Sequence, residues 1–70
     1  MTAVTDIFGQ KVCFVEETTG VVEVKNGRFH YSVTLVIGQR FEIENDRSLT
    51  VITRTDTAFA IEKRRLEHAA

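Results

Sequence analysis

The stretch Val22–Val33, VEVKNGRFHYSV, decides the fold of this chain because it has the pattern of a β-hairpin. Asn-Gly is the pair preferred in two-residue type I′ turns, where both residues take positive φ. A turn at Asn26 and Gly27 places Lys25 opposite Arg28 and sorts the flanking residues by face. One face then carries Val22, Val24, Phe29, Tyr31, Val33 and Leu35. Because turn and alternation agree, we predict an antiparallel hairpin with this face in the core.

The rest of the chain continues the β pattern. Residues that are β-branched or aromatic recur, proline is absent, and turn-rich stretches separate the apolar runs. We predict five strands plus a sixth, at roughly 10–17, 21–25, 28–37, 40–44, 48–54 and 58–63. Three-residue loops are expected at roughly 45–47 and 55–57. A meander of short, twisted antiparallel strands is expected to curl into a small barrel or half-barrel, so the fold class is all-β.

The two ends of the chain lack a clear strand pattern. Residues 1–9 are expected to form a short helical or irregular lead-in, with Thr5 or Asp6 as a helix N-cap; an edge strand is the alternative. Residues 64–70 are expected to form a loose tail or a short terminal helical turn. The sequence contains no linker or repeat, and residues 1–70 are interpreted as one small β domain.

The small size of the chain favours self-association. A chain of 70 residues buries only about 60% of the surface that it exposes when unfolded. Its single cysteine, Cys13, cannot form an internal disulfide, and no Cys/His cluster offers a zinc site. The apolar run KVCFV, residues 11–15, predicts burial on both sides of a strand. We therefore expect a homodimer or higher oligomer, and docking of one protein partner by strand addition is an alternative.

Basic residues support a second hypothesis, binding of RNA or single-stranded nucleic acid. The candidate contacts are Lys25, Arg28 and His30 on the polar face of the hairpin, and the charge run Lys63, Arg64 and Arg65. Basic groups interleaved with aromatic rings bind single strands. However, the net charge is −1, and the predicted register turns Phe29 and Tyr31 into the core. Nucleic-acid binding is therefore the alternative function.

We do not expect an enzyme. Cys13 lies among apolar neighbours, where a thiol packs as a small apolar group and is not reactive. His30 is expected at the surface beside Glu23. The residue patterns of catalytic, cofactor and metal sites are not found in the sequence. It has no apolar run of ~20 residues and no signal-peptide pattern, so a cytoplasmic location without membrane contact is expected. The sequence thus predicts a non-catalytic interaction module with an accessory or regulatory role.

Overall fold

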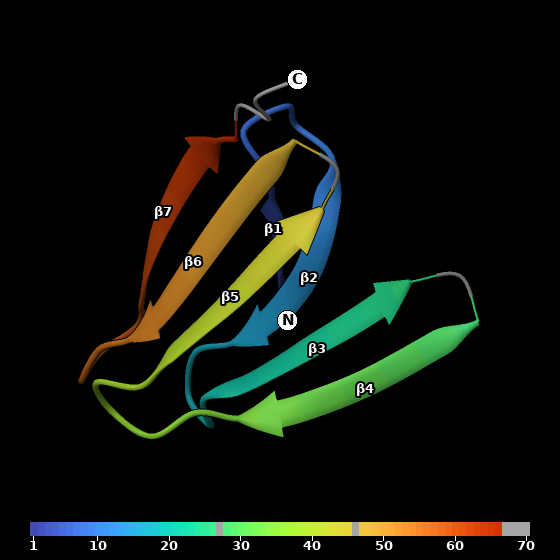
Figure 1. Ribbon diagram of the computed structural model, residues 1–70. Helices are drawn as coiled ribbons and strands as arrows, with labels where there is room; N and C mark the ends of the chain where they lie inside the picture. Colours follow the sequence, from blue (N-terminus) through green and yellow to red (C-terminus); the bar gives the residue numbers. More distant parts are fainter. Residues whose placement is uncertain (27, 46, 67–70) are drawn as a thin grey trace.

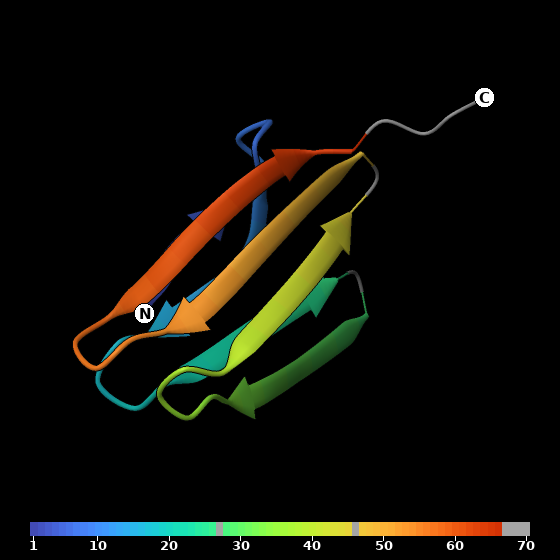
Figure 2. The ribbon, with the colours of Figure 1, turned by 60° about the vertical axis from the view of Figure 1, so that its left-hand side comes forward.

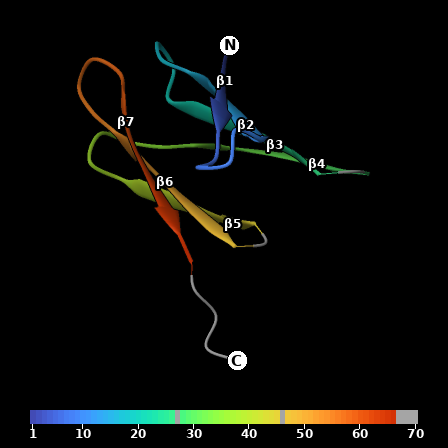
Figure 3. The same cartoon turned by 90° about the horizontal axis from the view of Figure 1, so that it is seen from above.

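The computed structural model describes residues 1–26, 28–45 and 47–66, which form seven antiparallel β-strands. The strands are β1 (Thr2–Thr5), β2 (Lys11–Glu16), β3 (Val21–Asn26), β4 (Phe29–Thr34), β5 (Arg40–Asn45), β6 (Ser48–Arg54) and β7 (Phe59–Arg65) (Figure 1). Strands β1 to β4 pair in chain order as the first sheet, and β5 to β7 pair in chain order as the second sheet. The two sheets face each other as layers (Figures 2 and 3).

The all-β antiparallel meander predicted from the sequence is confirmed, with seven strands instead of five or six. The described strands make two facing sheets and do not close into a barrel. The expected helical or irregular lead-in is wrong, because residues 2–5 pair with β2 as the edge strand β1. The expected tail at 64–70 is wrong for Arg64 and Arg65, which belong to β7; residues 67–70 lie outside the described part of the chain.

The core lies between the two sheets. Its buried apolar residues are Val4, Val12, Cys13, Val15, Val22, Val24, Leu35 and Ile52. Most of them come from the first sheet, while β6 contributes Ile52 at the centre of the second sheet. A β-bulge between Val4 and Thr5 shifts the β1–β2 register. Bulges re-aim side chains, which explains how both Val12 and its neighbour Cys13 are buried.

Hydrogen bonds hold one end of the sandwich, and one of them, from Arg54 to Leu35, joins the two layers. The Arg54 Nη1 donates to the Leu35 carbonyl oxygen at 2.6 Å, and the Leu35 amide donates to the Gly20 carbonyl at 2.8 Å. On the other side, the Gly38 amide donates to the Arg54 carbonyl at 2.7 Å. Gly20 has a φ of 81°, and a Cβ atom there would collide with the Arg54 guanidinium. This position therefore requires glycine for both its backbone angle and its packing.

The opposite end is joined by a buried carboxylate. Asp6 lies in the β1–β2 turn, where its Oδ1 accepts hydrogen bonds from the amides of Phe8 and Gln10, each at 2.9 Å. Its Oδ2 accepts from the Ser48 Oγ of β6 at 3.3 Å. Asp6 thus caps a turn where a helix N-cap was expected, and it ties the first sheet to the second.

The β5–β6 register differs from the predicted one because polar residues face the interior. Asn45 pairs with Ser48, so only positions 46 and 47 separate the strands, in place of a three-residue loop. Ile43 then lies opposite Thr50, where Leu49 was expected. The bond from Asp6 compensates the buried Ser48 hydroxyl. Position 46 itself lies outside the described residues.

The ends of two other strands also differ from expectation. Strand β4 stops at Thr34, short of the predicted residue 37, because the chain turns at Gly38, whose φ is 90°. The Val36 amide donates to the side-chain oxygen of Gln39 at 3.1 Å, which holds this turn. Between β6 and β7, Arg54 pairs with Phe59, so the loop covers residues 55–58 instead of 55–57.

Candidate functional site

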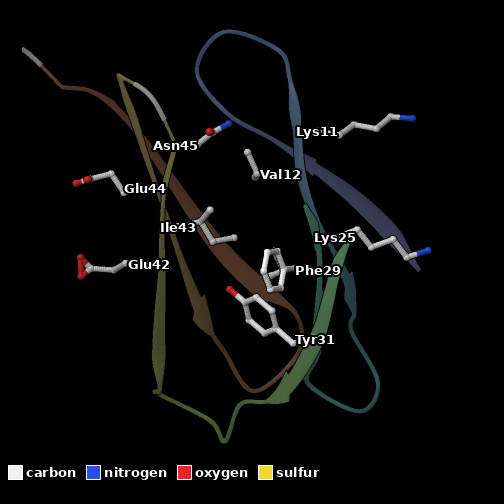
Figure 4. A pocket seen from close by; sticks show the side chains of 10 residues that line it. Lys11, Val12, Lys25, Phe29, Tyr31, Glu42, Ile43, Glu44 and Asn45 are labelled. Atoms are coloured by element: carbon white, nitrogen blue, oxygen red, sulfur yellow. The ribbon is translucent and has the colours of Figure 1, made fainter. Parts of the chain in front are cut away.

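A cleft of about 360 Å³ opens between the tip of the β3–β4 hairpin and strand β5 (Figure 4). Its lining residues are Lys11, Val12, Val24, Lys25, Phe29, Tyr31, Glu42, Ile43, Glu44 and Asn45. The side chains of Val12, Phe29, Tyr31 and Ile43 converge on the middle of this space (Figure 4). The middle of the cleft is therefore apolar and aromatic, polar groups make up much of its lining, and strands of both sheets border it.

The hairpin places the two aromatic rings in this cleft. Tyr31 pairs with Val24 and Val33 pairs with Val22, so these residues share the inner face of the first sheet. Val22 is completely buried, whereas Phe29 is 76% exposed and Tyr31 is 49% exposed. The hairpin projects beyond the strands of the second sheet (Figure 3), which leaves the inner face uncovered near its tip.

The prediction that Phe29 and Tyr31 lie in the core is therefore wrong, although the predicted face is confirmed. The register is also shifted, because Asn26 pairs with Phe29 and Lys25 pairs with His30, in place of Lys25 with Arg28. The shift moves the pairing by two positions, and side chains alternate with period two, so every residue keeps its face. The predicted turn residue Gly27 lies outside the described residues.

Strands β4 and β5 both border the cleft as outer strands of their sheets. Such a strand leaves the backbone N–H and C=O groups of alternate residues without a sheet partner. Charged side chains flank the opening and point away from it. Glu42 and Glu44 lie on the β5 side, and Lys11 and Lys25 lie on the opposite side (Figure 4). The rim of the cleft therefore has one acidic and one basic side.

Three of the predicted binding residues gather at the hairpin tip. Lys25 and His30 are cross-strand neighbours, and Arg28 is exposed in the adjoining turn. Glu23 of β3 lies 3.6 Å from the Lys25 Nζ and 3.3 Å from the His30 Nε2, which confirms the expected proximity of His30 and Glu23. This carboxylate offsets part of the positive charge at the tip, so the three residues do not form a purely basic surface.

The other three predicted residues lie on β7, the strand of the second sheet farthest from β5. Successive residues of a strand point to opposite faces. The Lys63 Nζ donates to the Thr5 Oγ1 of β1 at 3.0 Å, while Arg64 pairs with Glu62 on the other face at 3.0 Å. Arg65 is exposed at the strand end. The run Lys63–Arg65 is thus divided between faces, and the fold does not bring it together with the hairpin tip.

The described side chains show little of the chemistry that a catalytic centre needs. Cys13 is buried, and this burial raises the pKa of its thiol to about 11. A raised pKa keeps the thiol protonated near neutral pH, and the thiolate is the nucleophile. Within residues 1–26, 28–45 and 47–66, no three side chains of His, Cys, Asp or Glu are grouped to hold a metal ion.

The feature that sequence reasoning missed is the exposed aromatic pair. Alternation identifies the face on which Phe29 and Tyr31 lie, but it does not show how far the second sheet extends over that face. The sequence feature that could have indicated this limit is Gly38, because a turn there shortens β4 and starts the second sheet.

Comparisons with protein-family models, with curated proteins and with solved structures find no match to this chain. Over the described residues, no helix has the length and apolar character needed to cross a membrane.

Proposed function

We propose that this chain is a non-catalytic interaction module that self-associates through the cleft and the neighbouring strands β4 and β5, in an accessory or regulatory role. The observation that carries the proposal is the exposure of Phe29 and Tyr31, at 76% and 49%, on the inner face of a sheet. Aromatic rings are enriched at the centres of protein interfaces, where they contribute most of the binding energy. Covering each ring contributes about 1–2 kcal/mol.

A second copy is supported as the occupant by the charges at the rim. One side of the opening carries Glu42 and Glu44, and the other carries Lys11 and Lys25 (Figure 4). A partner with a single sign of charge meets repulsion on one of these sides. A copy related by two-fold symmetry presents both signs, since an isologous interface places the same surface on both partners.

The proposal is tested by sedimentation velocity over a range of concentrations. We expect the wild-type chain to dimerise, and Phe29→Ser together with Tyr31→Ser to weaken the dimer by about 100-fold or more, because two rings are removed from each copy. Val36→Ser is the matched control, since Val36 is 65% exposed in the β4–β5 loop and does not line the cleft. A wild-type chain that stays monomeric at high micromolar concentration would overturn the proposal.

Binding of single-stranded nucleic acid is the second candidate, and one observation favours it. The exposed rings of Phe29 and Tyr31 lie beside Lys25 at the mouth of the cleft, and stacking on an aromatic ring contributes about 1–3 kcal/mol per base. The carboxylates of Glu42 and Glu44 on the opposite side oppose a phosphate backbone. Fluorescence anisotropy with a labelled oligouridine tests this function. Salt-dependent binding that Arg28→Glu abolishes would favour it over self-association.

A further inference from the structure

Strands β4 and β5 match each other as possible neighbours. Each has six residues, each is an outer strand, and they run in opposite directions (Figure 1). Cross-strand pairing places the odd-numbered residues of both strands on the inner face, because Tyr31 pairs with Val24 and Phe41 pairs with Ile52. The even-numbered residues of both strands face outwards. The two strands thus have the same alternation, although they belong to different layers.

We infer that two copies exchange these edges, so that β4 of each copy pairs with β5 of the other around a two-fold axis parallel to the strands. This inference rests on the self-association proposed above and specifies its geometry. The first sheet of one copy, with four strands, then continues into the second sheet of the other copy, with three. Both outer strands at the cleft gain a partner, and the aromatic rings are covered at the join.

Alternation and complete overlap of the two strands together select one register. Directly opposite residues on antiparallel strands share a face, and complete overlap of 29–34 with 40–45 satisfies this rule at every position. Tyr31 then lies opposite Ile43 of the second copy, and Val33 lies opposite Phe41. On the outer face His30 meets Glu44 of the second copy, and Ser32 meets Glu42. The register therefore joins apolar to apolar side chains inside and a histidine to a carboxylate outside.

The alternative two-fold axis, perpendicular to the layers, fits less well. It pairs β4 with β4 and β5 with β5 of the second copy. A strand of six residues cannot overlap its own copy completely, because the pairing then joins inward-facing to outward-facing residues. The nearest permitted registers of β5 place Glu42 opposite Glu42 or Glu44 of the second copy, and like charges directly opposite are destabilising. Charge and alternation both favour the exchanged pairing of β4 with β5.

Pairing of β4 with β5 inside one chain is opposed by the loop between them. The Leu35 amide donates to the Gly20 carbonyl, which holds the start of the loop in the first sheet. The Gly38 amide donates to the Arg54 carbonyl, which holds its end in the second sheet. These bonds keep the two strands in separate layers, so a further neighbour of either strand would come from another chain.

A disulfide experiment tests the register. Chains carrying Ser32→Cys and Glu42→Cys are mixed and oxidised, because these positions lie opposite each other across the join, within the reach of a disulfide. We expect the disulfide between Ser32→Cys and Glu42→Cys chains to form about tenfold faster than a disulfide between Ser32→Cys and Thr53→Cys chains. Thr53 is the control position because it lies on the central strand β6. The wild-type chain, oxidised in the same way, is the control for any disulfide formed by the buried Cys13.

Two results would overturn the exchanged pairing and still leave self-association intact. In the first, the wild-type chain dimerises, but Ser32→Cys chains cross-link to each other faster than to Glu42→Cys chains, which indicates pairing of β4 with β4. In the second, the wild-type chain dimerises, but a chain that carries both Ser32→Cys and Glu42→Cys forms an intrachain disulfide. A monomeric wild-type chain instead removes the proposed function itself.

A charge exchange gives an independent readout. We expect His30→Glu to weaken its own homodimer by about 3- to 10-fold, because it creates two Glu–Glu pairs per dimer. We expect Glu44→Lys to weaken its own homodimer by a smaller factor, because it removes the carboxylate opposite His30 and repels that histidine only when the imidazole is protonated. A mixture of the two variants has one reversed pair and one wild-type pair, so the heterodimer is expected to form within about twofold of the wild-type affinity. A mixture no tighter than the two homodimers contradicts the pairing of His30 with Glu44.

Discussion

The two ends of the β3–β4 hairpin present the same kind of face to different surroundings. At the closed end of the sandwich, Val22 is completely buried and lies beside Val33, which packs against the core. Near the tip, Phe29 and Tyr31 lie on the same face and remain exposed. The difference teaches that alternation along a strand decides where a side chain points, while the extent of the facing layer decides whether it is buried.

The largest expected effect contrasts Ile52 with Phe29. Ile52 is completely buried at the centre of the second sheet, so Ile52→Ala is expected to reduce the free energy of unfolding by about 3–4 kcal/mol. Phe29→Ala is expected to cost less than about 1 kcal/mol in the monomer, because the ring is already in water. Urea denaturation at low protein concentration measures both. Equal losses would show that the cleft is closed in solution, and Ile52→Val provides a milder variant if Ile52→Ala does not fold.

The glycines sharpen the same comparison within the turns. Gly20 and Gly9 have similar positive φ angles of 81° and 86°. Only at Gly20 does a Cβ atom collide with neighbours, whereas nothing lies near it at Gly9. We expect Gly20→Ala to destabilise the chain by about 3 kcal/mol and Gly9→Ala by about 1 kcal/mol. Thermal unfolding of the pair isolates the packing of Arg54 against Gly20, and equal shifts in melting temperature would contradict that role.

The polar junction between the sheets should give a smaller effect. Asp6→Ala leaves the amides of Phe8 and Gln10 without their acceptor, and we expect a loss of about 2 kcal/mol in the free energy of unfolding. Ser48→Ala removes a single donor and is expected to cost about 1 kcal/mol. Denaturant titrations of both variants test the order. A greater loss from Ser48→Ala would show that the β1–β2 turn does not depend on Asp6.

The smallest effect concerns an exposed carboxylate in the β2–β3 turn. The pKa of Glu16 is lowered, first by the hydrogen bond from the Thr18 hydroxyl and then by the bond from the Thr18 amide. A folded-state pKa below the unfolded value stabilises the fold above the unfolded pKa, and this contribution is lost as pH falls through the folded pKa. We expect Thr18→Val to raise the pKa of Glu16 in an NMR titration. An unchanged pKa would assign the shift to the Thr18 amide and to the amino terminus, whose nitrogen lies 3.9 Å from the Glu16 Oε2.

Local sequence chemistry was sufficient for much of the fold. The alternation in Val22–Val33 correctly predicted the hairpin and its inner face, and the run KVCFV correctly predicted a strand. Its predicted burial on both sides is wrong, because Val12, Cys13 and Val15 pack in one core and Phe14 is only half-buried. Sequence patterns did not predict β1 as a strand, because an edge strand of four residues has too short a pattern to identify. They also failed for the β5–β6 register, where the distant Asp6 makes an inward Ser48 acceptable.

The basic residues show the same limit for the candidate site. The contact of Glu23 with His30 was expected from the hairpin, and the division of Lys63–Arg65 between faces follows from alternation once these residues belong to a strand. Only the tertiary structure brought Lys63 to Thr5 of β1 and kept β7 apart from the hairpin tip. The cleft itself joins residues of β2, β3, β4 and β5. A local sequence pattern does not predict that these strands border one cleft, because their proximity depends on the angle between the two sheets.

By itself, the sequence determined the strand periodicity and the face on which each side chain of the hairpin lies, since these follow from φ/ψ preferences and from the period of two residues. The tertiary structure alone decided which parts of those faces are covered. Burial depends on how far the second sheet reaches over the first, and the Arg54–Leu35 hydrogen bond joins the two sheets at the closed end. For this reason the same apolar face forms a core at Val22 and an open cleft at Phe29.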